Sequence, residues 1–236
     1  MSDAALLPPA SGWDGTRSLL LDHQGLPGWL SPVAEALPRV RAEQLSHFLP
    51  PRRGGRRSAV LILFGEGSRG PDVLLIQRAD GLRKHAGQPG FPGGGVDAAD
   101  GDPADPGTAV RAALREAWEE TGLEPSGVQV FGMLPSLYLP VSDFVVAPVL
   151  GWWREPTAVA PVDLGEVAEV FRVPVADLVE PVNRVRVRHP SGYVGPGFRV
   201  ADRVVWGFTG GLIAGVLRFA GWERPWDETA EVMLRD

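Results

Sequence analysis

The chain has 236 residues, 44% apolar and 22% charged, so length and composition predict one compact domain with extensions rather than a disordered chain. Its formal net charge of −6 argues against a general nucleic-acid binder, because such proteins usually carry a basic surface. The absence of cysteine excludes disulfides, zinc thiolates and thiol nucleophiles, and no apolar run reaches the roughly 18 residues that a membrane span needs.

Residues 1–56 are predicted to form an N-terminal extension, and residues 57–236 the main domain. Within the extension, segments 29–37 and 40–48 each have the pattern of a short helix, with Pro38 between them. The basic run at 51–57 is interpreted as a solvated linker, although contact with phosphate is an alternative.

Strand-like and helical segments alternate along the main domain. Apolar runs predict strands at residues 59–64, 73–78, 128–133, 144–152 and 170–173, and a half-exposed strand at 185–188. A loop rich in glycine and proline is expected at 81–107, an amphipathic helix at 108–122, a short helix at 174–179 and a largely buried helix at 204–219. Thr108 is the expected N-cap and Gly122 the expected C-terminal glycine of the amphipathic helix. This order indicates an α/β or α+β fold without a second domain.

Three glutamates are expected to share one face of the amphipathic helix. At about 100° of rotation per residue, Glu116, Glu119 and Glu120 fall within about 100° of arc. The opposite face, which we expect to pack on the protein, carries Val110, Leu114, Ala117 and Trp118. Carboxylates this close repel each other unless a cation lies among them, and Mg²⁺ prefers oxygen ligands. A solvated acidic face explains the helix pattern equally well.

The segment before this helix favours the metal-site interpretation. Residues 82–97, here called the glycine-rich loop, contain five glycines that let the backbone approach a phosphate or a metal ion closely. Arg83 and Lys84 at its start can pair with phosphate charge. Together, the loop and the acidic helix predict a site for a metal-bound diphosphate.

These motifs resemble a known family. Residues 115–123, Arg-Glu-Ala-Trp-Glu-Glu-Thr-Gly-Leu, match the second half of the Nudix box, and Phe91-Pro92-Gly93-Gly94 resembles its usual entry. Residues 74–78, the spacing of Arg83, Gly87 and Phe91, and segments 166–175 and 205–209 are similar to the coenzyme A pyrophosphatase subgroup. The resemblance covers about residues 57–217. It implies an α/β/α sandwich around a mixed β-sheet.

The resemblance also implies roles for individual residues. Glu116, Glu119 and Glu120 would bind Mg²⁺ or Mn²⁺, with Arg115 and Glu169 as further catalytic residues. Substrate would be bound by Arg83, Lys84, Gly87, Phe91, Gly93 and Gly94. Glu166 and Glu169 follow a proline-rich loop, and the resemblance favours Glu169 as a glutamate that reaches toward the metal over the alternative of a surface charge. The general base is open among Glu119, Glu169 and a hydroxide generated at the metal.

The sequence departs from the box at one ligand position, because Gly107 stands where the box has a glutamate. Asp97 and Asp100 are both candidates to replace it. His85 beside Lys84 is as consistent with a solvent-facing histidine as with a phosphate ligand. Tryptophans 152, 153, 222 and 226 are expected to contribute apolar area to a core or an interface, with adenine stacking as the less favoured alternative.

The expected activity is metal-dependent hydrolysis of coenzyme A or acyl-coenzyme A to 3′,5′-ADP and 4′-phosphopantetheine or its acyl derivative. Two alternatives stay open. The first is hydrolysis of another nucleoside diphosphate derivative, such as ADP-ribose or a dinucleotide. The second is a Nudix-fold binding module without catalysis, suggested by Gly107. We expect a cytoplasmic protein with a small-molecule substrate and neither nucleic acid nor membrane as partner; a homodimer is left open.

Overall fold

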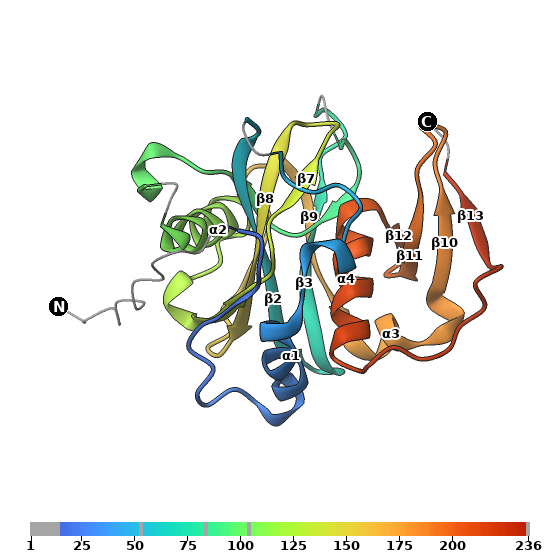
Figure 1. The fold of residues 1–236 in the computed structure, drawn as a ribbon, viewed down its shortest axis with the longest axis horizontal. Helices are drawn as coiled ribbons and strands as arrows, with labels where there is room; N and C mark the ends of the chain where they lie inside the picture. Colours follow the sequence, from blue (N-terminus) through green and yellow to red (C-terminus); the bar gives the residue numbers. More distant parts are fainter. Residues whose placement is uncertain (1–14, 52–53, 83–84, 103–104, 235–236) are drawn as a thin grey trace.

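The computed structural model describes residues 15–51, 54–82, 85–102 and 105–234. Within them, a nine-stranded mixed sheet contains strands in the order β1-β6-β8-β2-β3-β4, with β5 paired to β2, β7 to β8 and β9 to β3 (Figure 1). The two longest strands, β2 (Arg56–Gly67) and β8 (Phe144–Trp153), run parallel, whereas β2 and β3 (Gly70–Arg78) form an antiparallel hairpin. The other strands are β1 (Leu19–Leu20), β4 (Pro89–Gly90), β5 (Gly93–Gly95), β6 (Val128–Met133), β7 (Leu137–Leu139) and β9 (Val167–Pro174).

Helices cover both faces of this sheet (Figure 1). Successive side chains of a strand point to opposite faces, and in β2 both sets are apolar. Leu61 and Leu63 pack toward α2 (Pro106–Thr121), whereas Ile62 and Phe64 pack toward α1 (Ser31–Ala36) and α4 (Gly207–Phe219). The predicted α/β/α sandwich is therefore confirmed.

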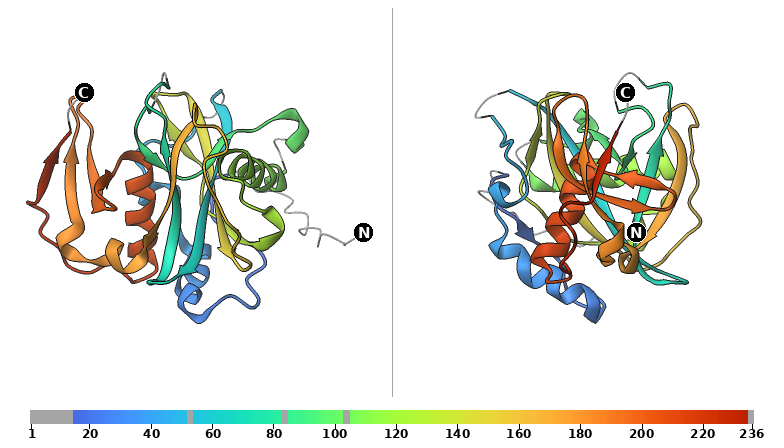
Figure 2. Two further views of the ribbon diagram at one scale, coloured as in Figure 1. Left: turned by 180° about the vertical axis from the view of Figure 1, so that it is seen from behind. Right: turned by 90° about the vertical axis from the view of Figure 1, so that its right-hand side faces the viewer.

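A second sheet lies beyond α4, of which only the strand at 185–188 was predicted. It has four strands in the described residues, in the order β12 (Arg203–Val205), β11 (Val194–Val200), β10 (Arg184–Arg188) and β13 (Glu231–Met233). Figure 2 shows α4 between the two sheets, next to the short α3 (Val175–Val179). This explains why α4 is apolar around most of its circumference. Residues 204–205, which were predicted to begin this helix, belong to β12 instead.

The described part of the N-terminal segment packs directly on the main sheet. Strand β1 pairs with β6, and Leu30, Val33 and Leu37 are completely buried in the core beneath α1 and α4. The first predicted helix is present as consecutive turns η1 (Gly28–Leu30), α1 and η2 (Leu37–Arg39). The second predicted helix, 40–48, is only the 3₁₀ turn η3 (Ala42–Gln44). The division of the chain at residue 56 remains a prediction.

We expect replacement of Leu37 by alanine to lower the free energy of unfolding by about 3 kcal/mol, because it removes a fully buried side chain that lies against the backbone of β6. Chemical denaturation measures this loss. The matched control is Val182→Ala in the 3₁₀ turn η6 (Pro181–Asn183), where the side chain is 75% exposed and little change is expected. Equal stability of Leu37→Ala and the wild type would show that the N-terminal segment does not contribute to the fold.

The remaining short turns are η4 (Ala98–Asp100), which precedes α2, and η5 (Pro125–Gly127), which precedes β6. Across the described ranges, none of the helices is long and apolar enough to cross a membrane.

Candidate functional site

The helix α2, which carries the three glutamates, has well-defined ends. The Asp105 side chain caps its N-terminus by accepting a hydrogen bond from the backbone N–H of Gly107 at 2.9 Å, and Pro106 occupies the first turn. The prediction of Thr108 as the cap was wrong, since the Thr108 hydroxyl donates to the carbonyl of Asp102 instead. Gly122 adopts a left-handed conformation with φ of 70°, as predicted for the C-terminal glycine.

The face of α2 that packs on the sheet differs from the predicted one. Ala113 and Ala117 are fully buried, and these small residues allow the helix to approach the sheet closely. Trp118, predicted to pack, is 54% exposed, whereas Glu120, predicted to lie on the open face, is only 6% exposed. The glutamates therefore do not form a solvated acidic surface, because one of them points into the protein.

Glu120 is held at the start of β5. Its Oε2 accepts a hydrogen bond from the backbone N–H of Gly93 at 2.8 Å, and its Oε1 lies 3.6 Å from Nη1 of Arg78 at the end of β3. Burial raises the pKa of the Glu120 carboxyl to about 7, although the Gly93 hydrogen bond and the Arg78 charge oppose this shift. The carboxylates of Glu116 and Glu166 raise it further.

Glu116 lies beside Gly94, the residue that follows Gly93 in the loop. A side chain at position 94 would collide with its carboxylate, so only glycine leaves room for this approach. Burial raises the pKa of Glu116, and the hydrogen bond and charge of Arg115 partly offset the shift. Two carboxylates from successive turns of α2 thus lie against the backbone of Gly93 and Gly94.

Arg115 connects the helix glutamates to the loop acid. It donates to Glu116 Oε1 and to Glu119 Oε2, both at 2.9 Å, and to the carbonyl of Gly95. It also binds both carboxylate oxygens of the buried Asp100, at 3.0 and 2.9 Å. These Arg115 hydrogen bonds are the largest cause that lowers the pKa of Asp100. The predicted pair of Arg115 and Glu119 is present.

Of the two candidate replacements for the box glutamate, Asp100 is the one beside the box arginine. Asp97 instead caps the 3₁₀ turn η4, where its backbone N–H also donates to Asp100 Oδ2 at 2.7 Å. Gly107 lies in the first turn of α2 as the partner of its cap, Asp105. Asp100, seven residues before Gly107, is therefore the candidate that binds Arg115.

The structure does not bring Glu169 to the helix glutamates. Glu169 pairs with Gln77 across β9 and β3, on the sheet face that also carries Leu75 and Phe171 and faces α4. Its carboxylate forms a 2.9 Å ion pair with Arg203. Glu166, just before β9, is close enough to Glu120 for its charge to act on that carboxyl. Alternation along β9 places Glu169 on the face of Phe171 and Val173, whereas Glu166 precedes the strand, beyond the register shift between Gln77 and Arg78.

The predicted substrate residues have different environments. Arg83 and Lys84 lie outside the described residues. Gly87, with φ of 63°, accepts a hydrogen bond at its carbonyl from the side-chain amide of Gln77. Phe91 is 5% exposed and packs in the core on the α4 side, so it anchors the loop. His85 Nδ1 lies 3.0 Å from Gln88 Oε1 within the loop.

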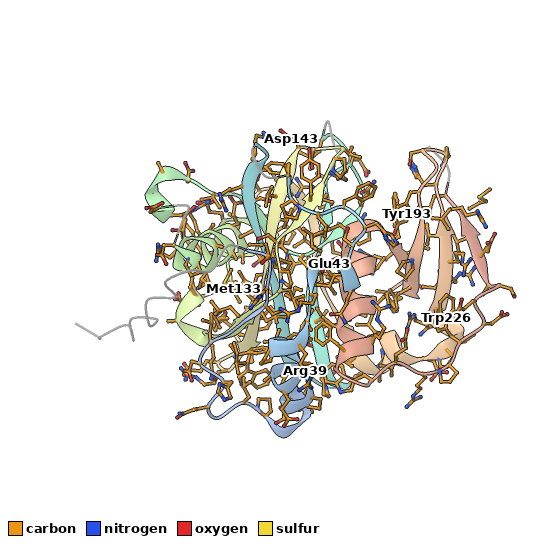
Figure 3. The ribbon with its side chains drawn as sticks, in the orientation of Figure 1. Arg39, Glu43, Met133, Asp143, Tyr193 and Trp226 are labelled. Atoms are coloured by element: carbon orange, nitrogen blue, oxygen red, sulfur yellow. The ribbon has the colours of Figure 1, made fainter. Side chains whose placement is uncertain are left out.

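The candidate tryptophans are engaged in packing, as expected. Trp152 and Trp153 are buried, and Trp222 contacts the ring of Trp29 at 6.2 Å between centroids. Trp226 lies under Arg184, beside the second sheet and far from α2 (Figure 3).

The donor atoms at this site fit a divalent metal ion. Buried carboxylates that repel one another, and whose pKa values are raised, are the oxygen ligands that a hard cation prefers and neutralises. The described ranges contain no group of three or more histidine, aspartate or glutamate side chains that is already close enough together to bind a metal ion. Arg115 binds one carboxylate oxygen of Glu116 and one of Glu119, so the second oxygen of each glutamate is not engaged by Arg115.

We expect Gly93→Ala to destabilise the protein by roughly 3 kcal/mol, because a methyl group there would clash with the carbonyl of Ala59 and the Cα of Val60 in β2. Gly95→Ala is the matched control, since an added Cβ at position 95 meets no atom within 4 Å. Urea unfolding of both variants compares them. Similar midpoints would mean that β5 does not hold the loop against β2.

A sandwich of this kind, with buried carboxylates beside a glycine-rich loop, is suited to bind a divalent cation and a phosphorylated substrate. The model of the NUDIX domain matches residues 55–192, and the chain belongs to the Nudix hydrolase family. These enzymes hydrolyse diphosphate linkages of nucleoside diphosphate derivatives and generally use divalent metal ions.

Two relatives and one solved structure illustrate what this chain is similar to. Nudix hydrolase NudL of Escherichia coli K12, described as uncharacterized, is 37% identical over 210 residues, which cover 84% of this chain and 93% of the relative. NudL of Shigella sonnei is 36% identical with the same coverage. A Nudix hydrolase of M. smegmatis, RenU, superimposes with a TM-score of 0.47 at 18% identity, covering 75% of this chain and 92% of its own.

Proposed function

We propose that this enzyme hydrolyses the diphosphate bond of coenzyme A or acyl-coenzyme A, releasing 3′,5′-ADP and 4′-phosphopantetheine or its acyl derivative. The observation that carries the proposal is the contact between the glycine-rich loop and α2. The loop whose spacing resembles the coenzyme A subgroup ends at Gly93 and Gly94, against the carboxylates of Glu120 and Glu116. A diphosphate bound along the loop would therefore meet the acidic end of α2.

Glu116, Glu119 and Glu120 would hold Mg²⁺ or Mn²⁺, with Glu119 using the oxygen that Arg115 does not bind. When bound, the cation polarises phosphoryl oxygens and lowers the pKa of water. Arg115, which is itself bound to Asp100, would keep Glu116 and Glu119 in place through its hydrogen bonds to them. Arg83 and Lys84 would bind the diphosphate and offset the negative charge that develops during transfer.

A carboxylate near Glu120 is also needed to accept the proton of the attacking water. Glu166 is better placed for this role than Glu169, because only Glu166 acts on the Glu120 carboxyl while Glu169 is paired with Arg203. The exposed Glu119 is the other candidate. A geometry in which Glu169 accepts the proton would require it to leave the α4 side of the sheet.

The substrate assignment is tested by incubating the protein separately with coenzyme A, acetyl-coenzyme A, ADP-ribose and NADH. Each reaction contains Mg²⁺ or Mn²⁺, and matched reactions contain a chelator. We expect metal-dependent release of 3′,5′-ADP from coenzyme A or its thioester at a higher kcat/KM than any product from the other compounds. Preferred turnover of ADP-ribose or NADH would contradict the substrate assignment. No turnover of any compound would contradict the proposed activity.

A further inference from the structure

Arg203 of β12 lies outside the segment that matches the family, yet its side chain reaches the main sheet. Its Nε donates to the carbonyl of Ala201 at 2.8 Å, its Nη1 to Gln77 Oε1 at 3.3 Å, and its Nη2 to Glu169 Oε2 at 2.9 Å. The guanidinium also lies 4.2 Å above the ring of Phe171. A planar fork with partners along its edges and against its face has little freedom to move.

Gln77 extends this connection into the glycine-rich loop. While its amide oxygen accepts from Arg203, its amide nitrogen donates to the carbonyl of Gly87. Two residues farther on, Pro89 pairs with Gln77 itself in β4, and the next residue, Gly90, pairs with Ile76. One side chain of β3 therefore joins β12 to the part of the loop that the resemblance assigns to substrate.

The neighbouring residue continues the connection on the opposite face of the sheet. Arg78 lies 3.6 Å from the Glu120 carboxylate, and Glu120 in turn accepts from the N–H of Gly93. Both ends of the loop are thus held from the last two residues of β3. The end near Gly87 depends on Arg203, and the end near Gly93 depends on the helix α2.

We propose that Arg203 is a positioning residue for substrate binding, which fixes the glycine-rich loop through Gln77 and neutralises Glu169. The proposal rests on the proposed function in assigning a diphosphate substrate to this loop. Loss of Arg203 would weaken substrate binding in two ways. The Gly87 end of the loop would lose its support, and the Glu169 carboxylate, now unpaired, would repel an anionic substrate.

The kinetic test compares Arg203→Met with Arg188→Met. Both arginines belong to the second sheet and both form ion pairs, but Arg188 binds the two carboxylate oxygens of Glu231, within the second sheet. With coenzyme A and Mg²⁺, we expect Arg203→Met to raise KM about tenfold, the effect of losing one charged hydrogen bond, with kcat within about threefold. Gln77→Leu should raise KM similarly, and the double variant should add little.

Amide hydrogen exchange of the metal-free protein tests the positioning without any substrate. We expect faster exchange of peptides within residues 85–95 in Arg203→Met and Gln77→Leu, but wild-type exchange in Arg188→Met. Unchanged exchange of this loop in Arg203→Met would overturn the proposal, whatever the substrate proves to be. Faster exchange in a protein that hydrolyses no coenzyme A derivative would support the positioning role and refute only the proposed function. An unchanged KM in an active Arg203→Met enzyme would refute the role in substrate binding.

Discussion

Replacement of Glu120 by glutamine is expected to lower kcat for metal-dependent hydrolysis by about a hundredfold or more, because it removes a buried anionic ligand of the cation. Glutamine keeps an oxygen that can accept the hydrogen bond from Gly93, so the fold and the loop should be retained. Steady-state rates at saturating Mg²⁺ measure the effect. Full activity of this variant would contradict the assignment of Glu120 as a metal ligand.

The same substitution should stabilise the metal-free protein at alkaline pH. The pKa of Glu120 rises from an ordinary 4.5 to about 7 in the folded state, so the folded protein binds more protons than the unfolded chain between these values. The contribution of Glu120 to stability therefore falls as pH increases from about 4.5 to 7. In chelator at pH 8, we expect Glu120→Gln to unfold with a free energy roughly 2 kcal/mol higher than the wild type. The difference should disappear below pH 4.5.

Added Mg²⁺ serves as the control for this stability measurement. A ligand that binds only the folded state raises its stability, so the cation should stabilise the wild type more than Glu120→Gln. If glutamine instead destabilised the metal-free protein at pH 8, burial of the charged carboxylate would not be costly at this position.

Arg115→Met is expected to have the second large effect, a loss of about 3 kcal/mol in the free energy of unfolding together with reduced turnover. Arg115 donates to both carboxylate oxygens of Asp100, whose side chain is 4% exposed. The variant removes this charged partner and leaves the buried carboxylate with the hydrogen bond from the N–H of Asp97. Denaturant titration measures the loss. Arg188→Met is the control, since an exposed ion pair contributes little to stability.

A double variant separates the orphaned charge from the loss of the arginine side chain. Adding Asp100→Asn to Arg115→Met removes the buried charge, so we expect it to recover part of the lost stability without recovering activity. Failure of Asp100→Asn to recover any stability, or equal stability of Arg115→Met and Arg188→Met, would contradict the role of Asp100 as the partner that fixes Arg115.

Much of the main sheet could be predicted from local sequence pattern. β6 was predicted at its observed bounds, and β2, β3 and β8 were found within a few residues of theirs, because apolar runs buried on both faces are distinctive. The second sheet was missed apart from β10. Its other strands are short or contain glycine and proline, and β13 pairs in parallel with a strand more than forty residues earlier. Such pairing depends on tertiary contacts that a local pattern does not contain.

The part of the candidate site that lies within the recognised motif could be predicted from the sequence. The neighbourhood of Glu116, Glu120, Gly93 and Gly94 follows from a loop that returns to the helix it precedes. The opposite exposures of Trp118 and Glu120 did not follow, because an ideal helical wheel assumes that polar residues face water, and here the Gly93 amide offers a buried partner. The expectation that Glu169 reaches the metal came from the resemblance, whereas alternation with Phe171 along β9 places Glu169 on the α4 side of the sheet.

The central claim is that this site directs water to a phosphorus atom of a diphosphate. Hydrolysis of coenzyme A in water enriched in ¹⁸O tests this claim most directly. Mass spectrometry of the products should detect one ¹⁸O atom in either 3′,5′-ADP or 4′-phosphopantetheine, only when a divalent cation is present. Absence of both products with Mg²⁺ and Mn²⁺, or products formed equally well in chelator, would contradict it.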